Sequence, residues 1–262
     1  LAWRTDQYTW VAEVKSLLFG HALVSTPFCV YGGIVASDEA ARAALESAAC
    51  ALAQQLGVHH LEMRNRERRH PTWSCKDLYV TFRRPIDPES DKNMLAVPRK
   101  QRAMIRKGMK EGLRVEIDVT VDRHYAIYSE SLRNLGTPVF GRRYLRVLKD
   151  TFGEACDIVT ILKDDRPVAS VLNFYFRDEV LPYYGGGTQE ARVVAGNDFM
   201  YWQVMERARE RGCRVFDFGR SKRDSGAFDF KSYWGFEPAP LFYEYFLVKR
   251  KKAQGCRIFY AR

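Results

Sequence analysis

The spacing of hydrophobic residues predicts strands and helices in the first third of the chain. A helix should begin at Asp38 and end at Gly57, because Leu45, Leu52 and Leu56 recur at helical spacing between an N-capping acid and a glycine. Strand-like segments with β-branched and aromatic residues flank this helix. They lie at residues 21–31, 58–63 and 78–82, whereas residues 10–18 fit either a helix or a strand. This order predicts a first α/β unit.

The remaining two thirds of the chain show a different order of elements. Apolar residues at helical spacing predict helices, and alternating ones predict strands. The helices are expected at 99–110, 122–135 and 142–152, and the strands at 113–121, 157–162, 167–176 and 179–184. Short polar turns after residues 162 and 176 make the last three strands an antiparallel meander. A helix, a strand at 214–218, a loop and a strand at 241–248 should follow.

Residues 183–246 carry the densest set of candidate features. Three glycines, residues 185–187, predict a sharp turn after a strand and a place where a ligand can approach the main chain. Asn197 or Asp198 should cap the next helix, which ends at Gly212. Such a strand–helix–strand unit places the strand ends beside the helix N-terminus, where α/β folds bind ligands and where N–H groups favour an anion.

Composition sets the domain organisation and the class of protein. The polar segment 85–92 predicts a boundary, which gives an N-terminal unit at 1–92, a second domain at 93–250 and a basic tail at 251–262. Because the first residue is Leu1, the chain is expected to be a fragment or a processed form, with its first unit truncated at the start. Hydrophobic content of 46% and charged content of 28% are typical of a globular protein.

Charge and cysteine usage narrow the expected surroundings. A net charge of +10 favours an anionic partner such as a nucleic acid, a nucleotide-linked substrate or a membrane surface. Six cysteines without a C-x-x-C pair fit the reducing cytosol. The uncharged stretch 22–37 is shorter than the ~20 apolar residues of a membrane span, so no transmembrane segment is predicted. The histidines at 59, 60 and 70 lack zinc-type spacing, and no metal site is predicted.

The segment 99–110 is the most basic part of the chain, with six cations and no acid. On a helix, Arg99, Arg102 and Arg106 share one side, where like charges repel unless an anion neutralises them. Arg102 and Arg106 are therefore candidate contacts to the phosphate of a nucleotide- or lipid-linked sugar. A solvated basic face is the alternative.

Several motifs, taken in order, resemble those of a known family. The element order after residue 93 resembles the GNAT acyltransferase fold. The runs RKQRAMIRKGMKEGLRV (99–115), YYGGG (183–187), FDFG (216–219) and FKSYWGF (230–236) resemble signatures of the FemAB family, and in particular its subgroup associated with exosortase/PEP-CTERM exopolysaccharide systems. The resemblance implies an α/β fold with mixed sheets and two GNAT-like acyltransferase units in tandem, the first incomplete. It also implies transfer of amino acids from aminoacyl-tRNA to peptidoglycan precursors.

The segment before the central helix departs from CoA-using GNAT enzymes. These usually carry Q/R-x-x-G-x-G/A, whose N–H groups hold pyrophosphate. Here the nearest equivalent is RVVAGN at 192–197, with Ala195 in the place of the first glycine. This disfavours CoA and leaves aminoacyl-tRNA and acyl-CoA as the two donors considered. The predicted cofactor-binding residues are Gly185, Gly186, Gly196 and Asn197.

Acyl transfer to an amine requires a base for the amine, stabilisation of the carbonyl oxygen and a fixed arrangement of both reactants. The resemblance implies that the pair Phe230–Lys231 stabilises the transferring acyl centre. Lys231 stands among aromatic residues that would exclude water and strengthen its field. The alternative is a surface lysine that packs on those rings. Asp217 could act as base or orient the amine, or it could pair with Arg220 or Lys222 as plain structure.

These observations define one preferred function and two alternatives. The preferred function is an N-acyltransferase or aminoacyltransferase that modifies an amine of a peptidoglycan or exopolysaccharide precursor, in the cytoplasm or at the inner face of the membrane. Tyr184 and Arg220 complete the predicted substrate-binding residues, and no permanently bound cofactor is expected. The alternatives are an acetyl-CoA-dependent GNAT enzyme that acts on an amino sugar and a non-catalytic module that binds tRNA or another polyanion.

Overall fold

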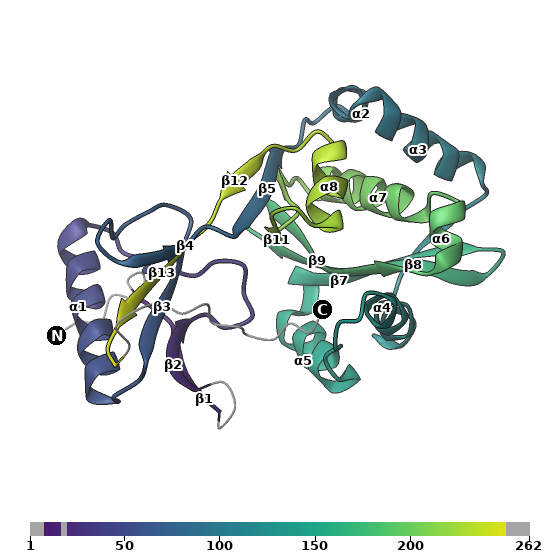
Figure 1. Cartoon of the computed structure of the whole chain (residues 1–262). Coiled ribbons are helices and arrows are strands. Elements are labelled where there is room, and N and C mark those ends of the chain that lie inside the picture. The colour runs from purple at the N-terminus through teal and green to yellow at the C-terminus, as the bar shows by residue number, and fades with distance from the viewer. Residues whose placement is uncertain (1–7, 17–19, 250–262) are drawn as a thin grey trace. The chain divides into compact units, whose positions relative to one another are not determined.

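The computed structural model describes residues 8–16 and 20–249, which form two compact units. Unit 1 comprises the described residues up to Thr81 together with residues 220–223 and 239–249. Unit 2 comprises residues 82–219 and 224–238. Figure 1 shows both units, and each is described below by itself. The predicted division after residue 92 concerns tandem domains rather than compact units, and it stays a prediction.

Unit 1 is a five-stranded sheet with one long helix. The strands follow the order β1-β2-β3-β13-β4. β2 and β3 run parallel, and the other neighbours are antiparallel. The elements are β1 (Val11–Ser16), β2 (Gly20–Ser25), α1 (Glu39–Gln55), β3 (His60–Asn65), β4 (Ser74–Lys76) and β13 (Phe242–Leu247). The segment 10–18, whose sequence fitted either a helix or a strand, therefore contains a strand.

Helix α1 links the two parallel strands and closes the core of unit 1. The Asp38 carboxylate accepts a hydrogen bond from the Ala41 N–H at 2.7 Å, as expected for an N-cap. Gly57 follows the helix with φ of +60°, a conformation that glycine adopts without strain. Between these ends, Ala49 and Ala53 are buried against Leu61 and the rest of the apolar core. The predicted helix and its two terminal signals are confirmed.

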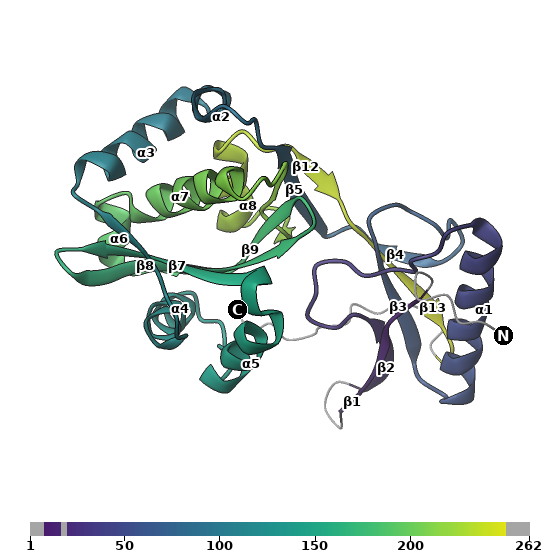
Figure 2. The same cartoon turned by 180° about the vertical axis from the view of Figure 1, so that it is seen from behind.

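Unit 2 contains a longer mixed sheet with helices on both faces. Its strands follow the order β5-β10-β9-β8-β7-β6, and β7, β8 and β9 form the predicted antiparallel meander. The strands are β5 (Tyr79–Pro85), β6 (Arg114–Ile117), β7 (Cys156–Lys163), β8 (Arg166–Phe176), β9 (Glu179–Gly187) and β10 (Val215–Asp217). Figures 1 and 2 show α3 and α7 on one side of this sheet and α4 and α5 on the other.

The helices of unit 2 include two whose bounds agree with the sequence prediction. α3 (Arg99–Lys110) and α5 (Arg142–Phe152) span the predicted residues. The remaining helices of unit 2 are α2 (Ser90–Ala96), α4 (Asp122–Asn134), η1 (Gly153–Ala155), α6 (Gln189–Val193), α7 (Gly196–Glu210) and α8 (Gly226–Tyr233). The short strand β11 (Ser221–Lys222) belongs to unit 1, as do two of the three residues of β12 (Pro238–Pro240). Within residues 8–16 and 20–249, no helix is long and apolar enough to cross a membrane.

Three sequence predictions require correction. Residues 185–187 form the end of β9 rather than a turn, and they pair in register with residues 169–171 of β8. Ala195, with φ of 54°, is the N-cap of α7, whereas Asn197 and Asp198 lie inside the helix. The aromatic segment that was expected as a loop contains helix α8. The strand predicted at 241–248 is confirmed as β13, which lies in the sheet of unit 1. The predicted basic tail at 251–262 lies outside the described residues.

Candidate functional site

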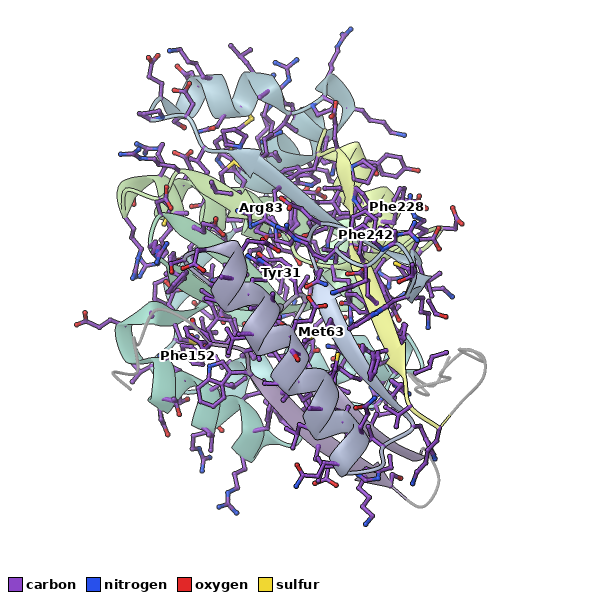
Figure 3. All side chains as sticks on the ribbon, turned by 90° about the vertical axis from the view of Figure 1, so that its left-hand side faces the viewer. Tyr31, Met63, Arg83, Phe152, Phe228 and Phe242 are labelled. Atoms are coloured by element: carbon purple, nitrogen blue, oxygen red, sulfur yellow. The ribbon has the colours of Figure 1, made fainter. Side chains whose placement is uncertain are left out.

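The carboxyl end of β10 is fixed by a buried ion pair. Asp217 is fully buried, and it accepts a hydrogen bond from the Arg83 guanidinium at 2.6 Å. Arg83, which is labelled in Figure 3, stands opposite Asp217 in the antiparallel β5–β10 pair. It also binds Glu179 at 3.0 Å. The second oxygen of Asp217 accepts the Gly219 N–H at 2.8 Å. The carboxylate therefore holds the chain where β10 ends, and its predicted role as a base stays a prediction.

Lys231 is anchored on the same segment. Its ammonium group donates to the carbonyl oxygens of Phe218 at 2.8 Å and Gly219 at 3.0 Å. It also lies 5.7 Å from the centre of the Phe82 ring. The side chain is half-buried on helix α8. The structure therefore brings Lys231 and Asp217 together at the end of β10. Lys231 binds two main-chain carbonyl groups of this segment, and Asp217 binds a main-chain N–H group.

Aromatic rings surround this end of the strand. The Tyr201 ring of α7 contacts Phe218 at 5.0 Å and Phe230 at 5.6 Å, both measured between ring centres. Phe218 also contacts Trp234 at 5.9 Å. Edge-to-face contacts of this kind are favourable and leave little room for water. The predicted partner of Lys231, Phe230, is thus part of an aromatic cluster whose members come from α7, α8 and the residue after β10.

Tyr201 also reaches the neighbouring strand. β9 and β10 run parallel, but their pairing covers only Glu179 and Val180 of β9, which continues to Gly187. The Tyr201 hydroxyl lies 2.8 Å from the position that a Cβ would take on Gly185. Its ring therefore occupies the region in which the two strands no longer pair. Burial raises the pKa of the Tyr201 hydroxyl to about 12, so it stays protonated at neutral pH.

The N-terminus of α7 is covered by the unit's own side chains. Ala195 is only 2% exposed and Gly196 is buried. The Asp198 carboxylate accepts hydrogen bonds from Gln101 of α3 and, at 3.2 Å, from the Trp234 indole N–H. Burial raises the pKa of this carboxyl group, while these two hydrogen bonds oppose the rise. An anion would therefore meet packed side chains at this helix terminus instead of open N–H groups.

The predicted cofactor-binding residues lie against the same packing. A Cβ on Gly185 would meet Tyr201, and one on Gly186 would lie 2.7 Å from the Cβ of Ser131. A Cβ on Gly196 would lie 3.2 Å from the Cα of Ala191, and the Asn197 side chain lies against Gly187. The glycines thus allow close approach by helices of this chain. Their binding of a cofactor stays a prediction.

Tyr184 belongs to a different cluster of unit 2. Its hydroxyl forms a 3.0 Å hydrogen bond with the hydroxyl of Tyr144 from α5, and its ring packs on Tyr128 of α4. Burial is the main cause that raises the pKa of Tyr184, and the hydrogen bond between the Tyr184 and Tyr144 hydroxyls also raises it. The side chain is only 8% exposed. Its predicted contact with substrate is not tested by this arrangement.

The three predicted arginines have different surroundings. Arg106 is exposed on α3, and Arg102 is half-buried with a buried Nε that has no hydrogen-bond partner among the described residues. Arg220 belongs to unit 1, where it donates to the Tyr243 hydroxyl at 3.0 Å and lies 4.6 Å from the Tyr79 ring centre. These contacts hold the Arg220 side chain in place. Binding of substrate by each arginine stays a prediction.

Sequence reasoning missed three residues of this site: Arg83, Tyr201 and Asp198 as a buried carboxylate. Arg83 is separated from Asp217 by 134 residues, so no local spacing could have paired them. Tyr201 lies within the predicted helix that ends at Gly212, and it was given no role in the predicted site. A usable signal was present for Asp198. The first turns of its helix are rich in large apolar residues, and a carboxylate that is buried among them needs a partner.

Comparison with protein families identifies the fold. Residues 99–232, more than half of the chain, match the family described as acetyltransferase (GNAT) domain. The chain belongs to this GNAT family. A search of curated proteins found no match.

Solved structures share the fold of this GNAT protein at low sequence identity. FemX is 15% identical with a TM-score of 0.64, and the match covers 94% of this chain and 89% of FemX. The C-terminal domain of a putative lysylphosphatidylglycerol synthetase from Agrobacterium fabrum is 14% identical with a TM-score of 0.67, covering 92% and 84%. A tandem GNAT protein from the clavulanic acid pathway is 12% identical with a TM-score of 0.53, covering 95% and 85%.

These comparisons confirm the predicted fold class, a mixed α/β structure of GNAT type that is similar to a tandem GNAT protein. They also support the assignment as an acyltransferase. The resemblance to the FemAB family is supported at the level of the fold, through FemX. The subgroup linked to exosortase and PEP-CTERM systems stays a prediction.

Proposed function

We propose that this GNAT protein transfers an acyl or aminoacyl group to an amine of a cell-envelope precursor. The family supports acyl transfer, and the similar structures include FemX and a lysylphosphatidylglycerol synthetase domain. The observation that carries the proposal is the position of Lys231. Its ammonium group is fixed at the end of β10 among aromatic rings, in the unit that matches the family.

The proposed reaction assigns a role to Lys231 and to Asp217. The amine nitrogen forms a bond to the carbonyl carbon of the donor, and negative charge develops on the carbonyl oxygen. The Lys231 ammonium group stabilises that charge, and the surrounding rings strengthen its field by keeping water away. The bond between the carbonyl carbon and the donor oxygen or sulfur then breaks, and the proton lost by the amine passes to the leaving group. Asp217 holds the segment on which Lys231 is anchored.

An aminoacyl-tRNA is the donor that we favour. In the CoA-dependent arrangement, N–H groups at the start of the central helix hold the pyrophosphate. Here this terminus is buried, and the Asp198 carboxylate lies in the first turn. A carboxylate and a pyrophosphate repel each other, and Gln101 and Trp234 already bind that carboxylate. With a tRNA donor, the reaction would take place in the cytoplasm, and the exposed cations of α3 would face an anionic partner.

The test compares transfer by the wild type with transfer by Lys231→Met, which keeps an unbranched side chain, one atom shorter, and removes its charge. Radiolabelled aminoacyl-tRNA and a nucleotide-linked peptidoglycan precursor serve as substrates. We expect kcat to fall by about 10²–10³-fold. Lys222→Met, an exposed lysine of β11, is the matched control and should retain full turnover. Equal turnover in Lys231→Met and the wild type would refute the role of Lys231.

An acetyl-CoA-dependent enzyme acting on an amino sugar is the second candidate, and the description of the matching family favours it. Titration calorimetry with acetyl-CoA separates the two donors. Saturable binding together with acetylation of an amino sugar would replace the aminoacyl-tRNA proposal. If RNA binds with a steep salt dependence and neither donor supports transfer, the protein is a binding module.

A further inference from the structure

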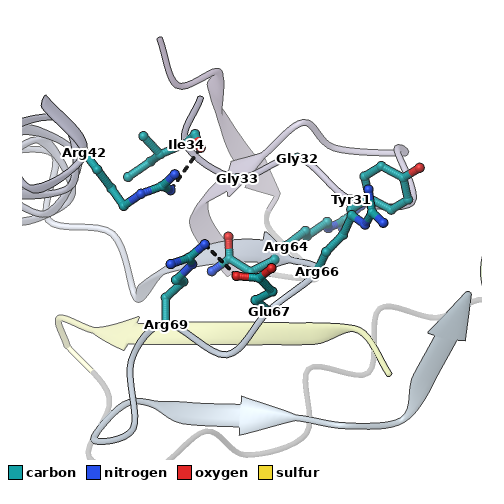
Figure 4. Close-up of a pocket in the computed structure, with 10 residues that line it drawn as sticks. Tyr31, Gly32, Gly33, Ile34, Arg42, Arg64, Arg66, Glu67 and Arg69 are labelled. Carbon is teal, nitrogen blue, oxygen red and sulfur yellow. Dashed lines mark hydrogen bonds and ion pairs between the residues drawn. The ribbon is translucent and has the colours of Figure 1, made fainter. Parts of the chain in front are cut away.

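Unit 1 contains a cavity of about 420 Å³ that none of the predicted site residues lines (Figure 4). It lies at the carboxyl ends of the parallel strands β2 and β3. The loop 31–34 follows β2, and Arg64 and Asn65 end β3. Arg42, from the start of α1, also lines it. The crevice outside the carboxyl ends of parallel strands is where α/β sheets bind ligands.

The lining of this cavity is strongly basic. Among the described residues that line it, four carry guanidinium groups and one, Glu67, carries a carboxylate. The four arginines are Arg42, Arg64, Arg66 and Arg69, and they come from α1, β3 and the loop after β3. Guanidinium groups that converge from separate elements suit an oxyanion with several oxygens, because each planar fork can donate two hydrogen bonds.

Three of these arginines have partners that hold them in place. The buried Arg64 binds Glu62 at 2.7 Å and the Cys29 carbonyl oxygen at 2.8 Å. Arg42 donates to the Ile34 carbonyl oxygen at 3.2 Å, and Arg69 binds Glu67 at 2.6 Å. Figure 4 shows the Arg42 side chain directed toward Ile34 and that of Arg69 directed toward Glu67.

Arg66 differs from the other three. In the part of the chain that the structure describes, it has no acidic partner, and its guanidinium carbon lies 5.4 Å from the centre of the Tyr31 ring. The cavity thus keeps one positive charge that no carboxylate of the described chain neutralises. The N–H groups of Gly33 and Ile34, in the same lining, also have no acceptor among residues 8–16 and 20–249.

The loop that carries Arg66 and Arg69 is fixed by hydrogen bonds to one buried carboxylate. Glu244 of β13 accepts hydrogen bonds from the His70 N–H at 2.8 Å and from the Asn65 side chain at 2.7 Å. It also accepts the Arg69 N–H at 3.2 Å. A loop whose backbone is fixed in this way loses little entropy when a ligand binds. The cavity is therefore organised before any ligand arrives.

We propose that the cavity of unit 1 is a binding site for a phosphate or diphosphate ester, with Arg66 as the main contact and Arg42 as a second one. The volume is larger than one phosphate needs and falls in the range of small-molecule sites. The same phosphate chemistry could come from a nucleotide or from a lipid headgroup.

Inorganic pyrophosphate is the first probe, in titration calorimetry with the full chain at low salt. We expect saturable binding that Arg66→Ala weakens by about tenfold or more. The matched control is Arg68→Ala, which removes the same charge two residues away. Arg68 is exposed, lies outside the lining and donates to the Pro71 carbonyl oxygen. The control should change affinity by less than about twofold.

A second variant and three further probes complete the test. Arg42→Gln, on a different element, should also weaken binding of pyrophosphate. Adenosine diphosphate and uridine diphosphate represent the nucleotide source. Vesicles of phosphatidylglycerol in phosphatidylcholine represent the lipid source. Whichever probe loses affinity in Arg66→Ala but not in Arg68→Ala identifies the source. Absence of saturable pyrophosphate binding, or equal weakening by Arg66→Ala and Arg68→Ala, would overturn the proposal.

Discussion

The two units use the same plan, a helix that links parallel strands, but differ at the carboxyl ends of those strands. In unit 1, α1 links β2 and β3, and these ends border an arginine-lined cavity. In unit 2, α7 leads from β9 to β10, and Tyr201 and Asp198 fill the corresponding region. The difference shows that a parallel pair supplies only the location of a site. The side chains that follow the strands decide whether the location stays open.

Charge is handled differently in the two units as well. Unit 2 buries Asp217 against Arg83, whereas unit 1 leaves Arg66 exposed beside Tyr31. A buried pair makes the structure depend on both partners. An exposed cation contributes little to stability and remains available to a ligand. The predictions below test this contrast, starting with the largest expected effect.

Removal of one partner of the buried pair should destabilise unit 2 most. Asp217→Ala leaves the Arg83 guanidinium without its buried carboxylate and the Gly219 N–H without its acceptor. We expect a loss of about 3–5 kcal/mol in the free energy of unfolding. Chemical denaturation followed by circular dichroism measures it.

The matched control for Asp217→Ala is Glu67→Ala in unit 1, which breaks an exposed pair with Arg69. It should cost about 0–1 kcal/mol. If the two variants lose similar stability, the contrast between a buried and an exposed pair is wrong.

The second prediction concerns the buried His124 of unit 2. Burial lowers the pKa of His124 from 6.5 to about 4, and its Nδ1 lies 3.0 Å from the Ser170 hydroxyl. Between these pH values the unfolded chain binds the proton and the folded chain does not, so stability falls as the pH falls. From pH 7 to pH 5 we expect a loss of about 2 kcal/mol.

Urea denaturation at both pH values measures this effect. In His124→Leu, the part of the pH dependence that comes from this histidine should disappear, whereas His59→Gln in unit 1 should leave it in place. A wild-type stability that is unchanged between pH 7 and pH 5 would contradict the buried, neutral histidine.

The spacing of apolar residues was sufficient to predict helices and strands whose ends carry capping or turn residues. Helix α1 lies between Asp38 and Gly57, and the bounds of α5 follow its apolar spacing. The meander was readable because its strands are joined by short turns. Pairings that span long stretches of sequence could not be read in this way. Arg83 meets Asp217 across 134 residues, and β13 returns to the first unit, so both required the folded chain.

The glycines at 185–187 show why the predicted site was only partly correct. Glycine permits either a turn or close packing, and sequence alone does not separate the two. Here Tyr201, Ser131 and Asn197 approach the strand at these positions. In unit 1, the cavity was missed although a signal existed. The basic run at 64–69 follows a strand, but only the Arg99–Lys110 segment was considered as an anion contact.

The third prediction tests how tightly α3 closes the α7 terminus. A Cβ on Gly108 would lie 2.7 Å from the Cβ of Phe199 and 3.1 Å from the Ala195 carbonyl oxygen. Gly108→Ala should therefore cost about 1–3 kcal/mol, although alanine is the better helix former. Gly226→Ala, at the start of α8 with nothing within 4 Å, is the control and should be neutral or slightly stabilising. Thermal denaturation compares them, and a stabilised Gly108→Ala would mean that α3 and α7 pack loosely.

The smallest effect is expected at Glu244 of unit 1. Burial acts to raise the pKa of this carboxyl group, but the hydrogen bonds from the His70 and Arg69 main chain and from Asn65, with the charge of His70, lower it overall from 4.5. A carboxylate with a lowered pKa stabilises the fold above pH 4.5, and this contribution is lost as the pH falls through the folded pKa.

The loop at 66–70 should therefore loosen below pH 4.5. Hydrogen exchange at the His70 amide, which donates to Glu244, reports the change locally. In Glu244→Gln the carboxylate is replaced by a neutral amide, so protection of this amide should be lower at neutral pH and should no longer depend on acidification. Protection that still falls with pH in Glu244→Gln would show that another group, rather than Glu244, holds the arginine-bearing loop in place.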